Sequence, residues 1–64
     1  MKNTKIMIID DYEYELVYID STHFKAKNLS LGDNKFVDYI VYHIGQFQGC
    51  DCYDEINNWL HSQN

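Results

Sequence analysis

The residues with the most evident capacity for chemistry are two cysteines and two histidines in the second half of the chain. Cys50 and Cys52 are separated by one residue, and His43 and His61 flank them. Zn²⁺ prefers such ligands, but structural zinc sites usually place roughly two to four residues between cysteines. A disulfide across one residue would close a tiny loop and would join no distant parts of the chain. We therefore expect reduced thiols, no metal site and no other cofactor.

The same cysteines could act as nucleophiles, with His43 as the general base. A thiolate forms most readily near positive charge, whereas Asp51, Asp54 and Glu55 surround this pair with acids. The sequence offers no residue to orient the histidine and no loop to stabilise an oxyanion. These observations argue against cysteine catalysis.

Carboxylates in pairs can also catalyse acid–base chemistry. The closest group, at Asp10, Asp11, Glu13 and Glu15, lies on a predicted turn and the strand after it, where solvated acids are expected. The three glycines are isolated, so no phosphate-binding loop is present. We predict that the protein is not an enzyme and has no catalytic residues.

Three strands are predicted in the first half of the chain. Residues 4–9 are rich in Ile, and residues 12–19 alternate between tyrosines and Leu on one face and acids and aliphatics on the other. Asp10–Asp11 and Asp20–Thr22 are predicted turns. Residues 23–29 alternate again, with Lys on one face, and these lysines would suit an exposed sheet edge.

Residues 36–44 fit two structures. A helix could begin after Asp33 and end at Gly45, but the wealth of Val, Ile, Tyr and Phe favours a strand. Gly45–Gln46 then resembles a two-residue hairpin turn, and residues 47–50 would form the returning strand. We predict a loop at residues 29–35.

The last segment is the clearest helix, predicted from Cys52 to Ser62. Asp51 is the expected N-cap, and acids in the first turn complement the helix dipole. Tyr53, Ile56 and Leu60 share one face. The predicted fold class is α+β: one domain spanning residues 1–64, with a small antiparallel sheet of four to five strands and one C-terminal helix packed on one face.

The charge balance restricts the class of partner. Ten acids oppose five bases, all of them Lys, giving a net charge of −5 and a pI near 4.8. Proteins that bind nucleic acids or anionic membranes carry clustered Lys and Arg, so neither is an expected partner. The sequence has no apolar run long enough to span a bilayer, and residues 6–9 are too short for a signal peptide. We expect a cytoplasmic protein.

The acids and tyrosines of the first hairpin are the predicted partner-binding residues. An acidic face can dock where a basic protein expects phosphates, and tyrosines can supply buried contact area. The predicted contacts are Asp10, Asp11, Tyr12, Glu13, Tyr14 and Glu15.

We therefore expect a non-catalytic inhibitor that mimics nucleic-acid charge. It would block a host protein with a basic groove, such as a CRISPR nuclease, another defence nuclease or a DNA-repair glycosylase. The abundance of Asn, Lys, Ile and Tyr without Arg or Pro is typical of a phage or mobile element of a low-GC bacterium, which would place the protein in the host cytoplasm. The alternative is a structural or regulatory homodimer, without mimicry, joined by a sheet edge or by exposed tyrosines and Trp59.

Overall fold

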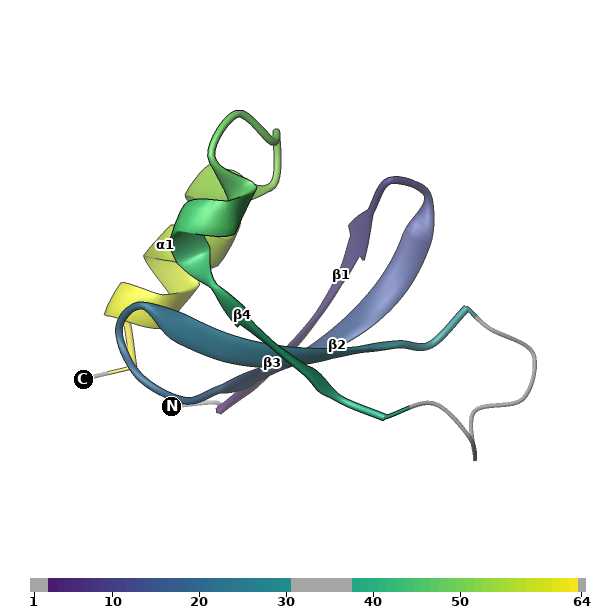
Figure 1. Cartoon of the computed structure of the whole chain (residues 1–64), viewed down its shortest axis with the longest axis horizontal. Helices are drawn as coiled ribbons and strands as arrows, with labels where there is room; N and C mark the ends of the chain where they lie inside the picture. The colour runs from purple at the N-terminus through teal and green to yellow at the C-terminus, as the bar shows by residue number, and fades with distance from the viewer. Residues whose placement is uncertain (1–2, 31–37, 64) are drawn as a thin grey trace.

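Four antiparallel strands, in sequence order across the sheet, form one layer of the fold. The computed structural model describes residues 3–30 and 38–63. The strands are β1 (Thr4–Ile9), β2 (Tyr12–Tyr18), β3 (His23–Asn28) and β4 (Ile40–His43). A short 3₁₀ helix, η2 (Ile44–Phe47), and the helix α1 (Tyr53–His61) follow. The helix lies against one face of the sheet (Figure 1), as the sequence predicts.

The β1–β2 hairpin closes through the predicted turn at Asp10 and Asp11. Ile9 pairs with Tyr12, so these two acids form a two-residue loop. Both have positive φ, 52° and 71°, which is the mirror-image turn whose twist matches that of the flanking strands. Aspartate tolerates this conformation better than most residues, so the sequence can form the tight turn without glycine.

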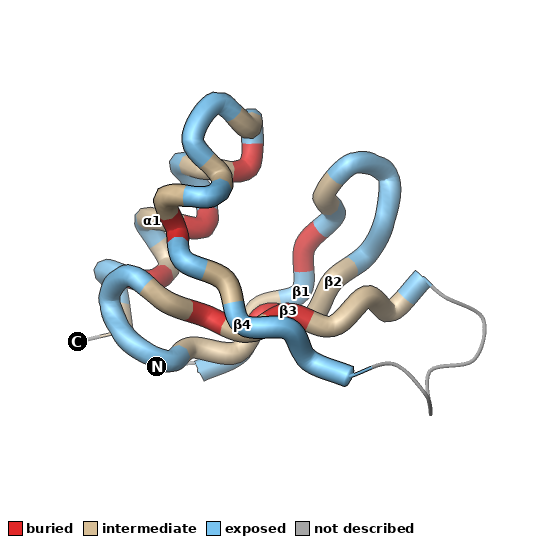
Figure 2. The backbone as a smooth tube through the Cα atoms, in the orientation of Figure 1, coloured by how far each residue is buried: buried red, intermediate tan, exposed pale blue. Residues whose placement is uncertain are grey.

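The core lies between the sheet and α1, where Figure 2 shows the buried segments facing one another. Leu16, Phe24, Ile56 and Leu60 have no measurable exposure. Phe24 is the centre of an aromatic cluster, with ring centroids 5.4 Å from Phe47 and 5.8 Å from Tyr42. The predicted faces of β2, β3 and α1 are therefore confirmed. Each of these three elements turns its apolar side inward, where burial removes apolar area from water.

Two predictions are wrong, the edge position of Lys25 and Lys27 and the exposure of Trp59, whereas Tyr12 and Tyr39 are exposed as predicted. β3 lies between β2 and β4, so Lys25 and Lys27 point from an interior strand toward the uncovered face of the sheet. Trp59 is half-buried, because its ring packs edge-on against Tyr18 and Phe24 at 6.4 Å. It therefore offers little free surface for a homodimer.

The segment after β4 also differs from prediction. Within the predicted segment 36–44 the described part does contain a strand, but residues 45–50 form no hairpin. Instead, the His43 Nδ1 accepts a hydrogen bond from the Gly45 backbone N–H at 2.9 Å, and the Gln46 side chain accepts one from the His43 N–H at 2.7 Å. This reciprocal cap starts η2 and directs Phe47 into the core. The predicted loop at residues 29–35 lies mostly outside the described residues.

The start of α1 differs from prediction by one residue and by its chemistry. The helix begins at Tyr53 after Cys52, and no side chain caps it, so Asp51 is not the N-cap. Cys50 and Cys52 are joined in a disulfide, with Cα atoms 5.2 Å apart, which corrects the expectation of reduced thiols. Gly49, at φ 88°, lets the chain turn so that the two sulfur atoms meet. Among the described residues, no helix has the length and apolar character needed to cross a bilayer.

Candidate binding groove

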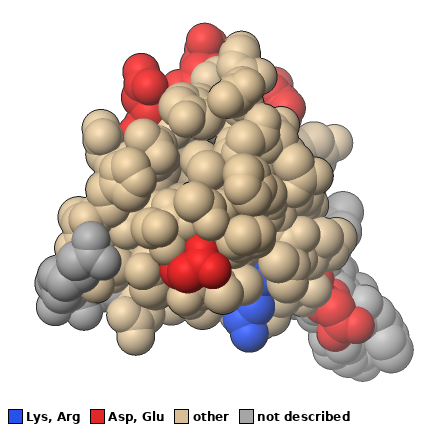
Figure 3. All heavy atoms as spheres, turned by 60° about the vertical axis from the view of Figure 1, so that its left-hand side comes forward, with Lys and Arg blue, Asp and Glu red and all other residues tan. Residues whose placement is uncertain are grey.

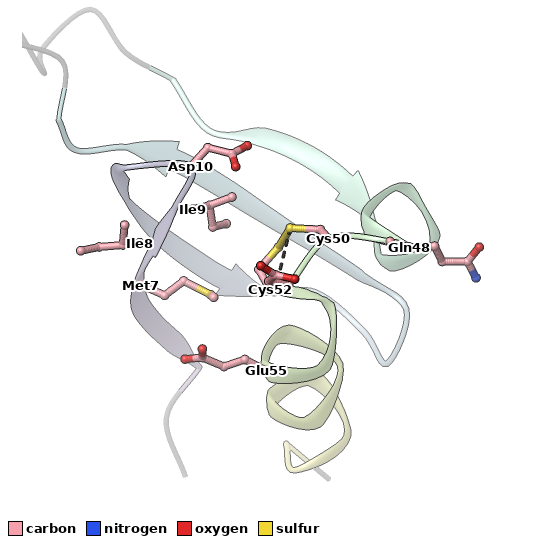
Figure 4. Close-up of a pocket in the computed structure, with 10 residues that line it drawn as sticks. Met7, Ile8, Ile9, Asp10, Gln48, Cys50, Cys52 and Glu55 are labelled. Carbon is pink, nitrogen blue, oxygen red and sulfur yellow. Dashed lines mark hydrogen bonds between the residues drawn. A yellow bond between two sulfur atoms is a disulfide. The ribbon is translucent and has the colours of Figure 1, made fainter.

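A groove opens between the end of β1 and the loop that leads into α1. It has a volume of about 740 Å³. Figure 4 shows Met7, Ile9 and the disulfide between the hairpin and the helix, while Ile8 and Gln48 point away. Cys50 and Cys52 therefore contribute apolar sulfur surface to the groove. Its lining residues are Met7, Ile8, Ile9, Asp10, Gln48, Gly49, Cys50, Asp51, Cys52 and Glu55.

The groove continues as a smaller apolar hollow on the same side of the sheet. This hollow, of about 170 Å³, shares Ile9 and Asp10 with the larger part. Its other lining residues are mainly aromatic: Tyr14, Phe24, Ala26, Tyr42 and Phe47. The larger part of the groove is thus lined by polar and apolar groups together, whereas the smaller hollow is mainly apolar and can take apolar groups or the aliphatic stems of long side chains.

Three carboxylates stand at the groove, and they come from distant parts of the sequence. Asp10 belongs to the hairpin turn, whereas Asp51 and Glu55 flank the start of α1. Glu55 forms an ion pair with Lys5 at 3.0 Å. No ion pair of Asp10 or Asp51 occurs within the described part of the chain. Asp10 and Asp51 therefore give the groove negative charge that is not compensated internally.

In Figure 3 acidic groups lie along the top of the molecule, the end at which Figure 1 places the hairpin tip and the loop before α1, and further acidic groups lie lower down. In the view of Figure 3, Lys or Arg atoms appear in one small area, and most of the visible surface is uncharged. The acidic surface visible in this view therefore includes that end of the molecule but is not confined to it.

The predicted contact residues are divided between two faces of the sheet. Asp10 and Tyr14 line the groove, and Tyr12 lies exposed on the same face at the hairpin end, opposite Ile9. Asp11 forms the tip of the hairpin. Glu13 and Glu15 lie on the opposite face of β2, which α1 does not cover. The groove residues that the sequence prediction missed are Asp51, Glu55, Tyr42, Phe47 and the disulfide.

Glu15 is already engaged on that opposite face. The Tyr39 hydroxyl donates a hydrogen bond to its Oε1 at 2.5 Å, and this bond raises the pKa of Tyr39 above its ordinary value of 10.0. Lys27 lies directly across from Glu15 in the neighbouring strand. The Lys25 and Lys27 ammonium groups lie 4.9 and 5.4 Å from the centre of the Tyr39 ring. The negative charge of Glu15 is therefore balanced locally.

The described residues offer neither a group of metal ligands nor a free thiol. Within residues 3–30 and 38–63, no group of three or more His, Cys, Asp or Glu side chains could hold a metal ion. The disulfide leaves neither cysteine free as a nucleophile. Comparison with protein-family models, with curated proteins and with solved structures finds no significant match to this chain.

Proposed function

We propose that the protein is a non-catalytic inhibitor whose acidic groove docks on the basic nucleic-acid-binding surface of a host protein. The observation that carries this proposal is that Asp10, Asp51 and Glu55 all line one groove, whose surface also includes Met7, Ile9 and the disulfide. A Lys or Arg side chain of the partner would lay its aliphatic stem on Met7 and Ile9 and direct its charge to the carboxylates. Nucleic-acid-binding proteins present such side chains in clusters.

The overall charge supports the same class of partner. A net charge of −5 attracts a basic surface over long range and speeds encounter. The partners proposed from the sequence remain the best candidates: a CRISPR nuclease, another defence nuclease or a DNA-repair glycosylase. The contact set shifts with the geometry. Asp10 and Tyr14 stay in it, and Asp51 and Glu55 join it because they line the groove. Glu13 and Glu15 leave it because they lie on the opposite face of the sheet.

The proposal is tested by capture from a low-GC bacterial lysate on the immobilised full chain, followed by elution with double-stranded DNA. We expect at least one nucleic-acid-binding protein to be retained at low salt and released by the DNA. A retained protein that DNA does not displace, or the retention of no nucleic-acid-binding protein, would contradict the proposal.

Two double variants with the same change in charge make the test specific to the groove. Asp10→Asn with Asp51→Asn removes the two uncompensated groove carboxylates and should reduce retention at least about tenfold, since charge-assisted contacts are lost. Glu13→Gln with Asp38→Asn removes two exposed acids outside the groove and should reduce it much less. Equal losses in the two variants would assign binding to net charge and not to the groove.

A further inference from the structure

The face of the sheet opposite α1, here called the outer face, is rich in exposed apolar residues. Ile6, Ile8 and Val41 are 52%, 68% and 61% exposed. These aliphatic side chains lie at the two edges of the sheet, and the strands between them carry Glu13, Glu15, Lys25 and Lys27. The helix occupies the other face (Figure 1), so no described helix of this chain covers the outer one.

The strand register orders the outer face into rows that run across the sheet. One row reads Ile6 on β1, Glu15 on β2 and Lys27 on β3, and it continues to Tyr39, whose ring lies beside Lys27. The next row reads Thr4, Val17, Lys25 and Val41. The order in the first row is therefore apolar, acidic, basic and aromatic. Reversing the first row places each of its groups opposite a complementary one, whereas reversing the second places Val17 opposite Lys25 and Thr4 opposite Val41.

We propose that two copies of this chain form a symmetric dimer through their outer faces. The two-fold axis runs parallel to the strands and passes between β2 and β3. This operation reverses the row, so that Glu15 of each copy faces Lys27 of the other, and Ile6 faces Tyr39. Val41 meets the β1 edge of the second copy. Sheets packed face to face in this aligned way are a common arrangement, and one self-complementary patch suffices for both copies.

A two-fold axis perpendicular to the strands would also stack the two outer faces, but the charges favour the axis parallel to the strands. An axis perpendicular to the strands would place β2 on β2 and bring the Glu13 and Glu15 side chains of both copies together, where like charges repel. The outer-face strands carry two Glu and two Lys, Glu13, Glu15, Lys25 and Lys27. The charges of these four residues cancel, although the whole chain has a net charge of −5. A second copy can therefore approach the outer face without the repulsion that two acidic grooves would experience.

The dimer does not depend on the proposed groove function. Pairing through the outer faces leaves the two acidic grooves pointing away from each other, free for partners. The first test is sedimentation equilibrium of the full chain across micromolar to millimolar concentrations. The average mass should rise from 7.7 kDa toward twice that value. A concentration-independent monomer over the whole range would overturn the proposal.

Two neighbouring residues on β4 provide a matched pair of variants. Val41 lies on the outer face and Ile40 on the opposite one, and their exposures, 61% and 58%, are similar. Val41→Asp should weaken the dimer at least about tenfold, because a carboxylate would be buried without a partner. Ile40→Asp should leave it unchanged. The opposite ranking of the two variants would place the interface elsewhere.

A charge exchange tests the axis itself. Lys27→Glu puts Glu against Glu across the proposed interface, and Glu15→Lys puts Lys against Lys, so each variant alone should be monomeric. Mixed in equal amounts, they should form a heterodimer, because each charge then faces its opposite. Mixed folded variants that stay monomeric would overturn the axis.

A measurement on the unmodified chain covers the case in which a variant fails to fold. In ¹³C methyl NMR spectra, the signals of Ile6, Ile8 and Val41 should shift on dilution, while those of Ile40 and Ile44 should not. Shifts confined to Ile40 and Ile44, or no shifts across the dimerisation range, would contradict the assignment of the outer face.

Discussion

Asp20 shows how one exposed side chain can organise a turn. Its Oδ1 accepts hydrogen bonds from the Thr22 and His23 backbone N–H groups at 2.9 and 2.8 Å, and it lies 3.0 Å from the His23 Nδ1. These bonds lower the pKa of Asp20 from 3.8 to about 2, and the bond from the Thr22 backbone has the largest effect. The ionised carboxylate is thus the form that the folded β2–β3 turn prefers.

The stability of the turn should therefore depend on pH. A lowered pKa means that the contribution of Asp20 is complete above pH 3.8 and is lost as the pH falls toward 2. Asp20→Asn should lower the free energy of unfolding at pH 7, and the variant and wild type should converge near pH 2. Urea denaturation at both pH values measures this difference.

A second aspartate provides the control. Asp38→Asn removes an exposed carboxylate that accepts no hydrogen bond from the described residues. At pH 7, Asp38→Asn should lower the free energy of unfolding less than Asp20→Asn does. A pH-independent effect of Asp20→Asn would show that the hydrogen bonds of the ionised form do not stabilise the turn.

At the scale of elements, the cap at the start of η2 decides the path of the chain after the sheet. The His43 Nδ1 accepts a hydrogen bond from the Gly45 N–H. A Cβ atom added to Gly45 would lie 2.9 Å from that same nitrogen. Such a distance is too short for a carbon atom, so the His43 ring must move and lose its hydrogen bond. The sequence thus needs glycine here for space, since its φ is not positive.

Gly45→Ala should therefore lower the free energy of unfolding by about 1 kcal/mol, the usual value of a helix cap. The same substitution in a His43→Ala background should be neutral or slightly stabilising, because the clash is gone and Ala restricts the unfolded chain. Thermal denaturation of the wild type, Gly45→Ala, His43→Ala and the double variant measures the coupling between the two positions. If Gly45→Ala lowered the free energy of unfolding equally with His43 and with Ala at position 43, the proposed role of the cap would be contradicted.

These elements also show what the sequence could and could not predict. The first hairpin and the last helix follow from local patterns, the alternation over residues 12–19 and the helical stripe of Ile56 and Leu60. η2 was missed because a side-chain cap at His43 outweighs the turn preference of Gly45–Gln46. The disulfide was missed because loop length alone does not show that the turn at Gly49 brings the sulfur atoms together.

At the scale of the whole molecule, the two faces of the sheet carry different chemistry. One bears α1, the core and the acidic groove, and the other bears the balanced charges and exposed aliphatic residues of the outer face. The acids at the helix start were visible in the sequence, but their approach to Asp10 depends on how α1 packs on the sheet. Sequence patterns report periodicity within elements and not the distances between them.

Asp10, Asp51 and Glu55 are proposed to bind a basic surface that otherwise holds nucleic acid. The most direct test is the dissociation constant of the captured partner measured between about 0.05 and 0.5 M salt, where the Debye length falls from roughly 14 to 4 Å. We predict affinity that falls steadily with salt for the wild type and falls less for Asp10→Asn with Asp51→Asn. An affinity that does not change with salt, or the same slope in both proteins, would contradict the account.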